Sequence, residues 1–175
     1  MGTMQRLMFG EFDGGRSERA AALLKACARA GIDAEIGTDV RRAIWEKFVF
    51  IVGLSALTSA TRKPIGPVRG NALTRALLLE IMTETVAVGR AHGVNLAEDF
   101  AEKRMAFVDT LPPEMTSSMH HDLEAGKRLE LDWLSGGVVE LGEAVNVPTP
   151  MNRAMRAILA IYANGNEEPP HAATQ

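Results

Sequence analysis

The alternation of apolar and polar positions near the start of the chain predicts a small β-α-β unit. Residues 6–12 form a strand candidate that ends at a glycine-rich turn. Ser17 can cap an alanine- and leucine-rich helix that ends near Gly31, and residues 32–36 alternate again as a second strand. Two short strands do not make a stable sheet alone, so this unit is expected to be the edge of something larger.

From residue 38 onward the pattern is helical almost throughout, which predicts a mainly α fold. The expected helices cover residues 39–61, 71–92, 96–109, 115–125, 129–143 and 150–164, with a turn at residues 64–67. The expected organisation is a β-α-β unit at residues 1–38, a helical domain at 39–165 and a disordered, polar tail at 166–175.

Composition fits a soluble globular protein. The chain has 175 residues, 46% hydrophobic and 23% charged, with a net charge of −3. This balance gives no reason to expect nucleic acid or a membrane as partner. The single cysteine, Cys27, cannot form an intramolecular disulfide, which favours a cytoplasmic location. The longest uncharged run, residues 48–61, is shorter than the roughly 20 residues of a membrane span.

Lys47 is the first candidate for chemistry, because it opens an apolar helical run at residues 48–54. A lysine whose stem lies in such surroundings loses hydration of its charge and becomes a better proton donor. The alternative is a lysine that reaches water from the helix edge. Positions 47, 51 and 55 share one helix face, so Lys47 is accompanied there by Ile51 and the hydroxyl of Ser55.

A second group of polar residues lies between residues 117 and 132. Ser118 can bind a ligand carboxylate or cap the helix that follows. Glu130, placed by the pattern just inside a helix start, can bond substrate hydroxyls or favour the helix dipole. His120 and His121 predict no metal site, because adjacent histidines point to different helix faces and the ligand spacings of zinc sites are missing.

The sequence offers no motif for a nucleotide cofactor. It contains neither a GxGxxG after a strand nor a P-loop, so nothing in it cradles a pyrophosphate, and we assign no cofactor-binding residue. Nucleophilic chemistry is poorly supported as well. No GxSxG elbow is present, and Cys27 is expected to be a small core residue.

Four motifs resemble, in order and spacing, the ketopantoate reductase (2-dehydropantoate 2-reductase) family. They are Trp45-Glu46-Lys47 before an apolar helix, Ser118-Met119-x-x-Asp122, Glu130-Leu131-Asp132-Trp133-Leu134-Ser135-Gly136, and Val147-Pro148-Thr149-Pro150-x-Asn152. The likeness covers roughly residues 5–163. It implies the C-terminal helical domain that this family shares in type with 6-phosphogluconate dehydrogenase, with residues 1–38 as the remnant of a Rossmann domain.

The resemblance also implies roles for particular residues. In the family, a Rossmann domain with NADPH delivers hydride to the ketone of 2-dehydropantoate, in pantothenate biosynthesis. The matching Lys47 is then the general acid toward the carbonyl oxygen, and Glu130 bonds the substrate hydroxyl. Ser118 helps to hold the substrate carboxylate, with Ser55 as a further substrate contact. Glu84 matches another acidic position of the family, with a less defined role.

The chain departs from the family pattern in two ways. The family's helix commonly carries asparagines one and two turns after the lysine, where this chain has Ile51 and Ser55, so a related 2-keto acid is an alternative substrate. A complete nucleotide-binding domain is also missing from the sequence. We therefore expect the chain not to bind NADPH alone, and to be inactive by itself or to depend on a separate nucleotide-binding partner.

Two other interpretations remain open. The chain can be a non-catalytic interaction module that kept the helical dimerisation surface, or an unrelated helical bundle that binds a small ligand between its helices. Apolar surface and strand edges left open by a missing domain favour self-association, so a homodimer is expected.

Overall fold

The computed structural model describes residues 6–166, which are mostly helical and contain one two-stranded sheet. The chain divides into two compact units, Met1–Glu46 and Lys47–Gln175, and the boundary falls inside a helix. The mainly α fold with a small β-α-β unit in front is confirmed. The predicted disordered tail lies outside the described residues, apart from residue 166.

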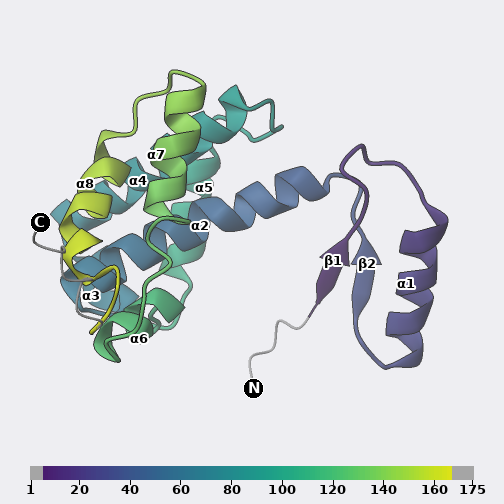
Figure 1. The fold of residues 1–175 in the computed structure, drawn as a ribbon, viewed down its shortest axis with the longest axis horizontal. Helices are drawn as coiled ribbons and strands as arrows, with labels where there is room; N and C mark the ends of the chain where they lie inside the picture. The colour runs from purple at the N-terminus through teal and green to yellow at the C-terminus, as the bar shows by residue number, and fades with distance from the viewer. Residues whose placement is uncertain (1–5, 167–175) are drawn as a thin grey trace, which may run out of the picture. The chain divides into compact units, whose positions relative to one another are not determined.

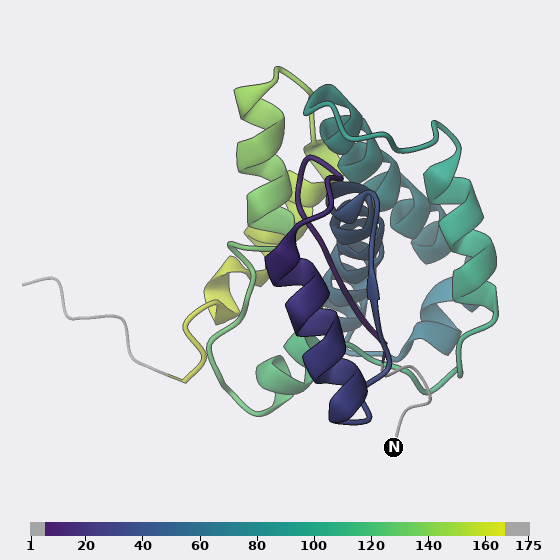
Figure 2. The ribbon, with the colours of Figure 1, turned by 90° about the vertical axis from the view of Figure 1, so that its right-hand side faces the viewer.

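The first unit is the predicted β-α-β arrangement. Strands β1 (Leu7–Phe9) and β2 (Ala34–Ile36) pair in parallel, and α1 (Glu18–Arg29) connects them and lies alongside the pair (Figures 1 and 2). Ser17 caps α1 as predicted, because its hydroxyl accepts the Ala20 N–H at 3.2 Å. Gly31 follows α1 in the left-handed region, with a φ of 71°, as a helix-ending glycine should.

Helix α2 (Val40–Thr61) runs from the first unit into the second. Asp39 caps its start, since Asp39 Oδ1 accepts the Arg42 N–H at 2.9 Å. The helix is long and apolar enough to cross a membrane by length and composition, but 50% of its apolar window is buried inside the protein. This burial is typical of the core helix of a soluble protein.

The second unit is built around α4 (Ala72–Ala91), which contacts most of the other helices. These are α3 (Ile65–Gly70), α5 (Phe100–Asp109), α7 (Ser135–Ala144) and α8 (Pro150–Leu159), with α6 (Ser118–Glu124) between α5 and α7 in sequence. Gly53 lets α2 approach α4 closely, because a Cβ there would lie 2.9 Å from both Leu78 Cδ1 and Met82 Cγ.

Three segments differ from the sequence-based expectation. Residues 65–70 form α3 where a turn was predicted; Pro67 is tolerated because the first-turn N–H groups of a helix need no intrahelical partner. Helix α5 begins at Phe100, four residues later than predicted, after a turn in which the Leu96 N–H bonds Val94 O at 2.8 Å. Residues 129–130 are irregular and residues 131–134 form a turn, so this segment is not the start of α7.

Candidate functional site

The predicted proton donor, Lys47, is the first residue of the second unit and is exposed to solvent. Of the two alternatives for Lys47, its exposure in the described chain fits the lysine that reaches water from the helix edge, and its chemical role stays a prediction. On the same face of α2, Ile51 is half-buried and Ser55 is only 4% exposed. The three residues thus follow the path of α2 from solvent into the interior of the second unit.

The second predicted group begins at the N-terminus of α6. The sequence left open whether Ser118 caps this helix. The cap is its neighbour Ser117, whose Oγ accepts the His120 N–H at 3.0 Å. Ser118 is the first residue of α6 and is exposed. Its hydroxyl is therefore not needed to cap the helix.

Three buried residues, which we call the α2–α6 joint, connect α6 to α2: Thr58, Ser117 and His120. Thr58 Oγ1 and Ser117 Oγ lie 3.0 Å apart, and His120 Nδ1 lies 2.7 Å from the Thr58 carbonyl oxygen. Ser118 directly follows Ser117, and Ser55 precedes Thr58 by one helical turn. The joint therefore brings the part of α2 that carries Ser55 next to the start of α6.

Glu130 lies in the irregular segment before α7, not inside a helix start as predicted. Its backbone carbonyl accepts the N–H groups of Trp133 and Leu134, each at 3.0 Å, while its side chain is exposed. Buried Leu129 and Leu131 hold this segment, and the Leu129 N–H bonds Ala163 O at 2.9 Å, so the backbone is engaged outside any helix. Tertiary contacts therefore override the helical pattern.

Within residues 6–166, the side chains of Lys47, Ser118 and Glu130 make no hydrogen bond or ion pair with one another or with other groups. All three are exposed. The structure thus leaves a cation, a hydroxyl and a carboxylate available for a ligand, and their roles stay predictions.

Glu84, the weaker candidate, has a structural partner that the sequence did not reveal. Its carboxylate accepts the Met151 N–H at 2.7 Å, the Asn152 N–H at 2.9 Å and the Asn152 side-chain amide at 2.7 Å. These N–H groups open α8, whose N-cap Thr149 makes no side-chain capping bond. Glu84 therefore caps α8 from α4, and its negative charge suits a helix N-terminus.

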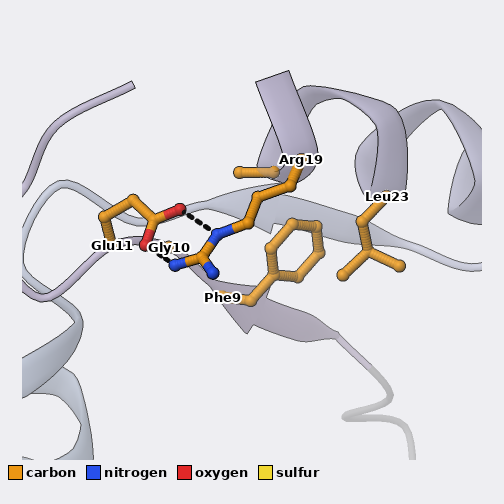
Figure 3. Close-up of a pocket in the computed structure, with 6 residues that line it drawn as sticks. Phe9, Gly10, Glu11, Arg19 and Leu23 are labelled. Atoms are coloured by element: carbon orange, nitrogen blue, oxygen red, sulfur yellow. Dashed lines mark hydrogen bonds and ion pairs between the residues drawn. The ribbon is translucent and has the colours of Figure 1, made fainter. Parts of the chain in front are cut away.

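The first unit contains a pocket of its own, lined by Phe9, Gly10, Glu11, Arg19 and Leu23 (Figure 3). Arg19 Nε donates to Glu11 Oε1 at 2.7 Å, and an ion pair joins the same side chains. Hydrogen bonds from Arg19 and Ser17 lower the pKa of Glu11 to about 2, and the pKa of Arg19 is raised. Because the two charges neutralise each other, this pocket offers no free cation to an anionic ligand.

None of the predicted site residues lines that pocket. The part of the chain that the structure describes also contains no group of three histidine, cysteine or acidic side chains that could hold a metal ion. The candidate chemistry thus depends on α2, the start of α6 and the segment before α7.

Comparison with known proteins identifies the class to which this arrangement belongs. A family model described as "Ketopantoate reductase PanE/ApbA C terminal" matches residues 39–163, most of the chain. The fold is therefore the C-terminal helical domain of an oxidoreductase. The chain belongs to the ketopantoate reductase family.

Individual relatives agree with this result. The 2-dehydropantoate 2-reductase of Mesorhizobium japonicum is 32% identical over 89% of this chain and 47% of its own length. An uncharacterized oxidoreductase of Bacillus subtilis, YkpB, is 28% identical over 90% of this chain and 52% of its own. The solved ketopantoate reductase of Ralstonia eutropha JMP134 is 31% identical, with a TM-score of 0.79 over 90% of this chain and 52% of that one. The chain thus spans about half the length of the relatives it matches.

Proposed function

We propose that this chain is the substrate-side part of an NADPH-dependent reductase that converts 2-dehydropantoate, or a related 2-keto acid, into the 2-hydroxy acid. The match of residues 39–163 to the C-terminal family model carries this proposal. We infer 2-dehydropantoate as substrate from the names of the relatives. A related acid is the alternative, because Ile51 and Ser55 stand where the family commonly has asparagines. We place the protein in the cytoplasm, with no nucleic acid or membrane as partner.

The described residues do not fit the phosphates of NADPH. The strand–loop–helix junction between β1 and α1 carries Glu11 and Asp13 and lacks the GxGxxG pattern. Asp13 Oδ1 already accepts the Gly15 N–H at 2.8 Å, and the Ser17 hydroxyl caps α1. The paired Glu11 adds no net charge, and the Gly15 N–H and the capped start of α1 are already engaged, so these groups are not available to a pyrophosphate. NADPH is therefore assigned to a separate nucleotide-binding domain, and the chain by itself is proposed to be inactive.

The chain's own contribution is then binding and proton donation. The Ser118 hydroxyl donates a hydrogen bond to the substrate carboxylate, and the Glu130 carboxylate accepts one from a substrate hydroxyl. Ser55 is only 4% exposed, so we give it no direct substrate contact. The Lys47 ammonium gives a proton to the ketone oxygen as negative charge develops there. A cation at that oxygen stabilises the transition state more than the ground state. The exposure of Lys47, Ser118 and Glu130 supports these roles.

A domain exchange tests the proposal. Residues 39–163 replace the corresponding segment of the Mesorhizobium japonicum enzyme, and NADPH oxidation is followed with 2-dehydropantoate and a panel of other 2-keto acids. The chimera should reduce at least one of these acids, and the preferred acid identifies the substrate. A folded chimera that reduces none of them contradicts the proposal.

Two lysine variants of the same chimera test the proton donor. Lys47→Ala should lower kcat by about 100-fold, the scale of a lost general acid. Lys63→Ala removes an exposed lysine beyond the end of the same helix and should leave kcat unchanged. Equal kcat values for the two variants would exclude Lys47 as the donor.

A separate experiment tests whether the chain alone binds NADPH. We expect no binding in a fluorescence titration of the unmodified chain with NADPH. Binding in the micromolar range would show that the chain holds the cofactor without a GxGxxG pattern, and would contradict this part of the proposal.

The alternative function, a non-catalytic interaction module, is favoured by one observation. The first unit exposes several large apolar side chains to solvent: Leu7, Met8, Phe12, Leu23, Ile32 and Ile44. Such a group is typical of a surface covered by another chain or domain. We therefore propose a homodimer or a complex with a nucleotide-binding domain. Light scattering at tens of micromolar should show a dimer, and a monomer would count against self-association.

A further inference from the structure

We propose that His120 is a positioning residue that fixes the start of α6, and with it Ser118, against the end of α2. This inference rests on the proposed function only for the role of Ser118 in carboxylate binding. The positioning itself depends on contacts within the second unit.

The first argument is the burial of His120. Its side chain belongs to a residue that is only 4% exposed, whereas the adjacent His121 is exposed. The ring of His121 bonds a different residue, with Nε2 2.8 Å from Thr116 Oγ1. His120 Nδ1 lies 2.7 Å from the Thr58 carbonyl oxygen, which only accepts hydrogen bonds, so Nδ1 carries the proton and donates. A buried histidine is thus fixed in one orientation by α2.

The carbonyl it bonds is the second argument. Thr58 O lies in the last turn of α2, where carbonyl groups lose their intrahelical partners. The N–H of Arg62, which would normally reach this carbonyl, bonds Ser59 O at 3.3 Å instead, and the chain leaves the helix there with Arg62 in the left-handed region at a φ of 52°. His120 therefore satisfies a buried acceptor that the helix leaves open, and its removal leaves that acceptor unpaired.

The third argument is that both contacts of α6 converge on Thr58. The Ser117 hydroxyl meets Thr58 Oγ1 and accepts the His120 N–H, while the His120 ring bonds Thr58 O. Ser118 stands between these two fixed residues in sequence, so its backbone position follows from theirs. The other ring nitrogen of His120, Nε2, lies 3.2 Å from a carboxylate oxygen of Glu124, but the orientation of the ring is fixed by the bond from Nδ1 to Thr58 O.

Two amide variants separate positioning from packing. In His120→Asn the side-chain amide nitrogen occupies roughly the place of Nδ1, whereas in His120→Gln it occupies roughly that of Nε2. Both are measured in the full chain by hydrogen exchange of the backbone amides at residues 119–121. His121→Asn, at the exposed neighbour, is the matched control.

We expect wild-type exchange rates in His120→Asn and His121→Asn, and rates about fivefold to tenfold higher in His120→Gln, as one buried hydrogen bond is lost. Unchanged rates in His120→Gln, or equal acceleration in the asparagine and glutamine variants, would overturn the proposal. A fall in thermal stability common to both variants, without a difference in exchange, counts against it in the same way.

A titration with 2-dehydropantoate adds the link to function. If the wild-type chain binds it, His120→Gln should raise Kd about fivefold to tenfold, while His120→Asn should stay close to wild type. Equal Kd values in all three proteins would overturn the link to Ser118. No binding to the wild-type chain would count against the proposed function, while the exchange rates still decide the positioning role.

Discussion

The two units of this chain differ in how much of their apolar surface they bury. Among residues 6–46 only Ala20 and Cys27 are buried, whereas the second unit has a core drawn from α2 to α8, with Ile65, Leu78 and Met119 at most 1% exposed. A domain is stable when its elements bury one face against another. The second unit does so by itself, while the first leaves its apolar side chains for something else to cover.

The candidate site residues all belong to the second unit, which has the buried core. Ser118 and Glu130 project from a unit whose interior is complete, on backbone that Ser117, Thr58 and Leu129 hold. Binding residues on a rigid scaffold are held in the geometry that a substrate needs. The first unit, in contrast, contributes a neutralised ion pair and no predicted site residue.

The largest expected effect tests whether α4 is the centre of the packed unit. Leu78→Ala should lower the free energy of unfolding by about 3 kcal/mol, because it opens a cavity at a side chain that is 1% exposed. Leu73→Ala, on the same helix but 81% exposed, should change it by less than about 0.5 kcal/mol. Urea denaturation followed by circular dichroism measures both. Similar losses in the two variants would contradict the assignment of the core.

The next effect concerns the cap of α8. Glu84→Ala removes the acceptor of three N–H groups and should cost about 2 kcal/mol in unfolding free energy. Glu80→Ala, one turn earlier on α4 and exposed, is the control and should be close to neutral. If Glu84→Ala is as stable as its control, the carboxylate does not hold α8.

The smallest effect belongs to the first unit and depends on pH. The pKa of Glu11 falls from its ordinary 4.5 to about 2 because Arg19 and Ser17 bond its carboxylate. A carboxyl with a lower pKa in the folded state stabilises that state fully above the unfolded value, and this contribution is lost as the pH falls from 4.5 toward 2. Amide NMR shifts of β1 and α1 should therefore change over that interval.

Glu11→Gln should remove this pH response, while Glu18→Gln, in the first turn of α1, should retain it. Since Arg19 and Glu11 stand at the surface, the response should also weaken with added salt. The same response in Glu11→Gln as in wild type would assign it to another carboxyl group.

Much of the fold follows from the sequence because the signals are local. Ser17, Asp39 and Gly31 mark helix ends through contacts with residues at most a few positions away, and the structure has those ends. Residues 129–134 show where local signals fail. Their leucines match a helix, but burial of Leu129 and Leu131 and a backbone bond to Ala163 hold them outside any helix.

The candidate site could be predicted only as separate motifs. Lys47, Ser118 and Glu130 were found through family motifs, but their exposure depends on packing that no motif records. His120 was considered only as a metal ligand, since nothing in the sequence places it beside Thr58, 62 residues away. The capping role of Glu84 was also missed, because its partners Met151 and Asn152 lie 67 and 68 residues away in the sequence. Contacts between residues more than 60 positions apart could therefore not be predicted from local sequence patterns.

The cap that Glu84 provides has a consequence for how the protein is made. A ribosome completes α4 long before it releases Met151 and Asn152, the residues that bond the Glu84 carboxylate. Until then this charged group has none of its native donors and depends on water. The second unit can therefore reach its final form only after the start of α8 has been synthesised. A chain that ends before residue 150 has no α8, so the parts of α4 and α7 that α8 contacts stay exposed to water and to proteases.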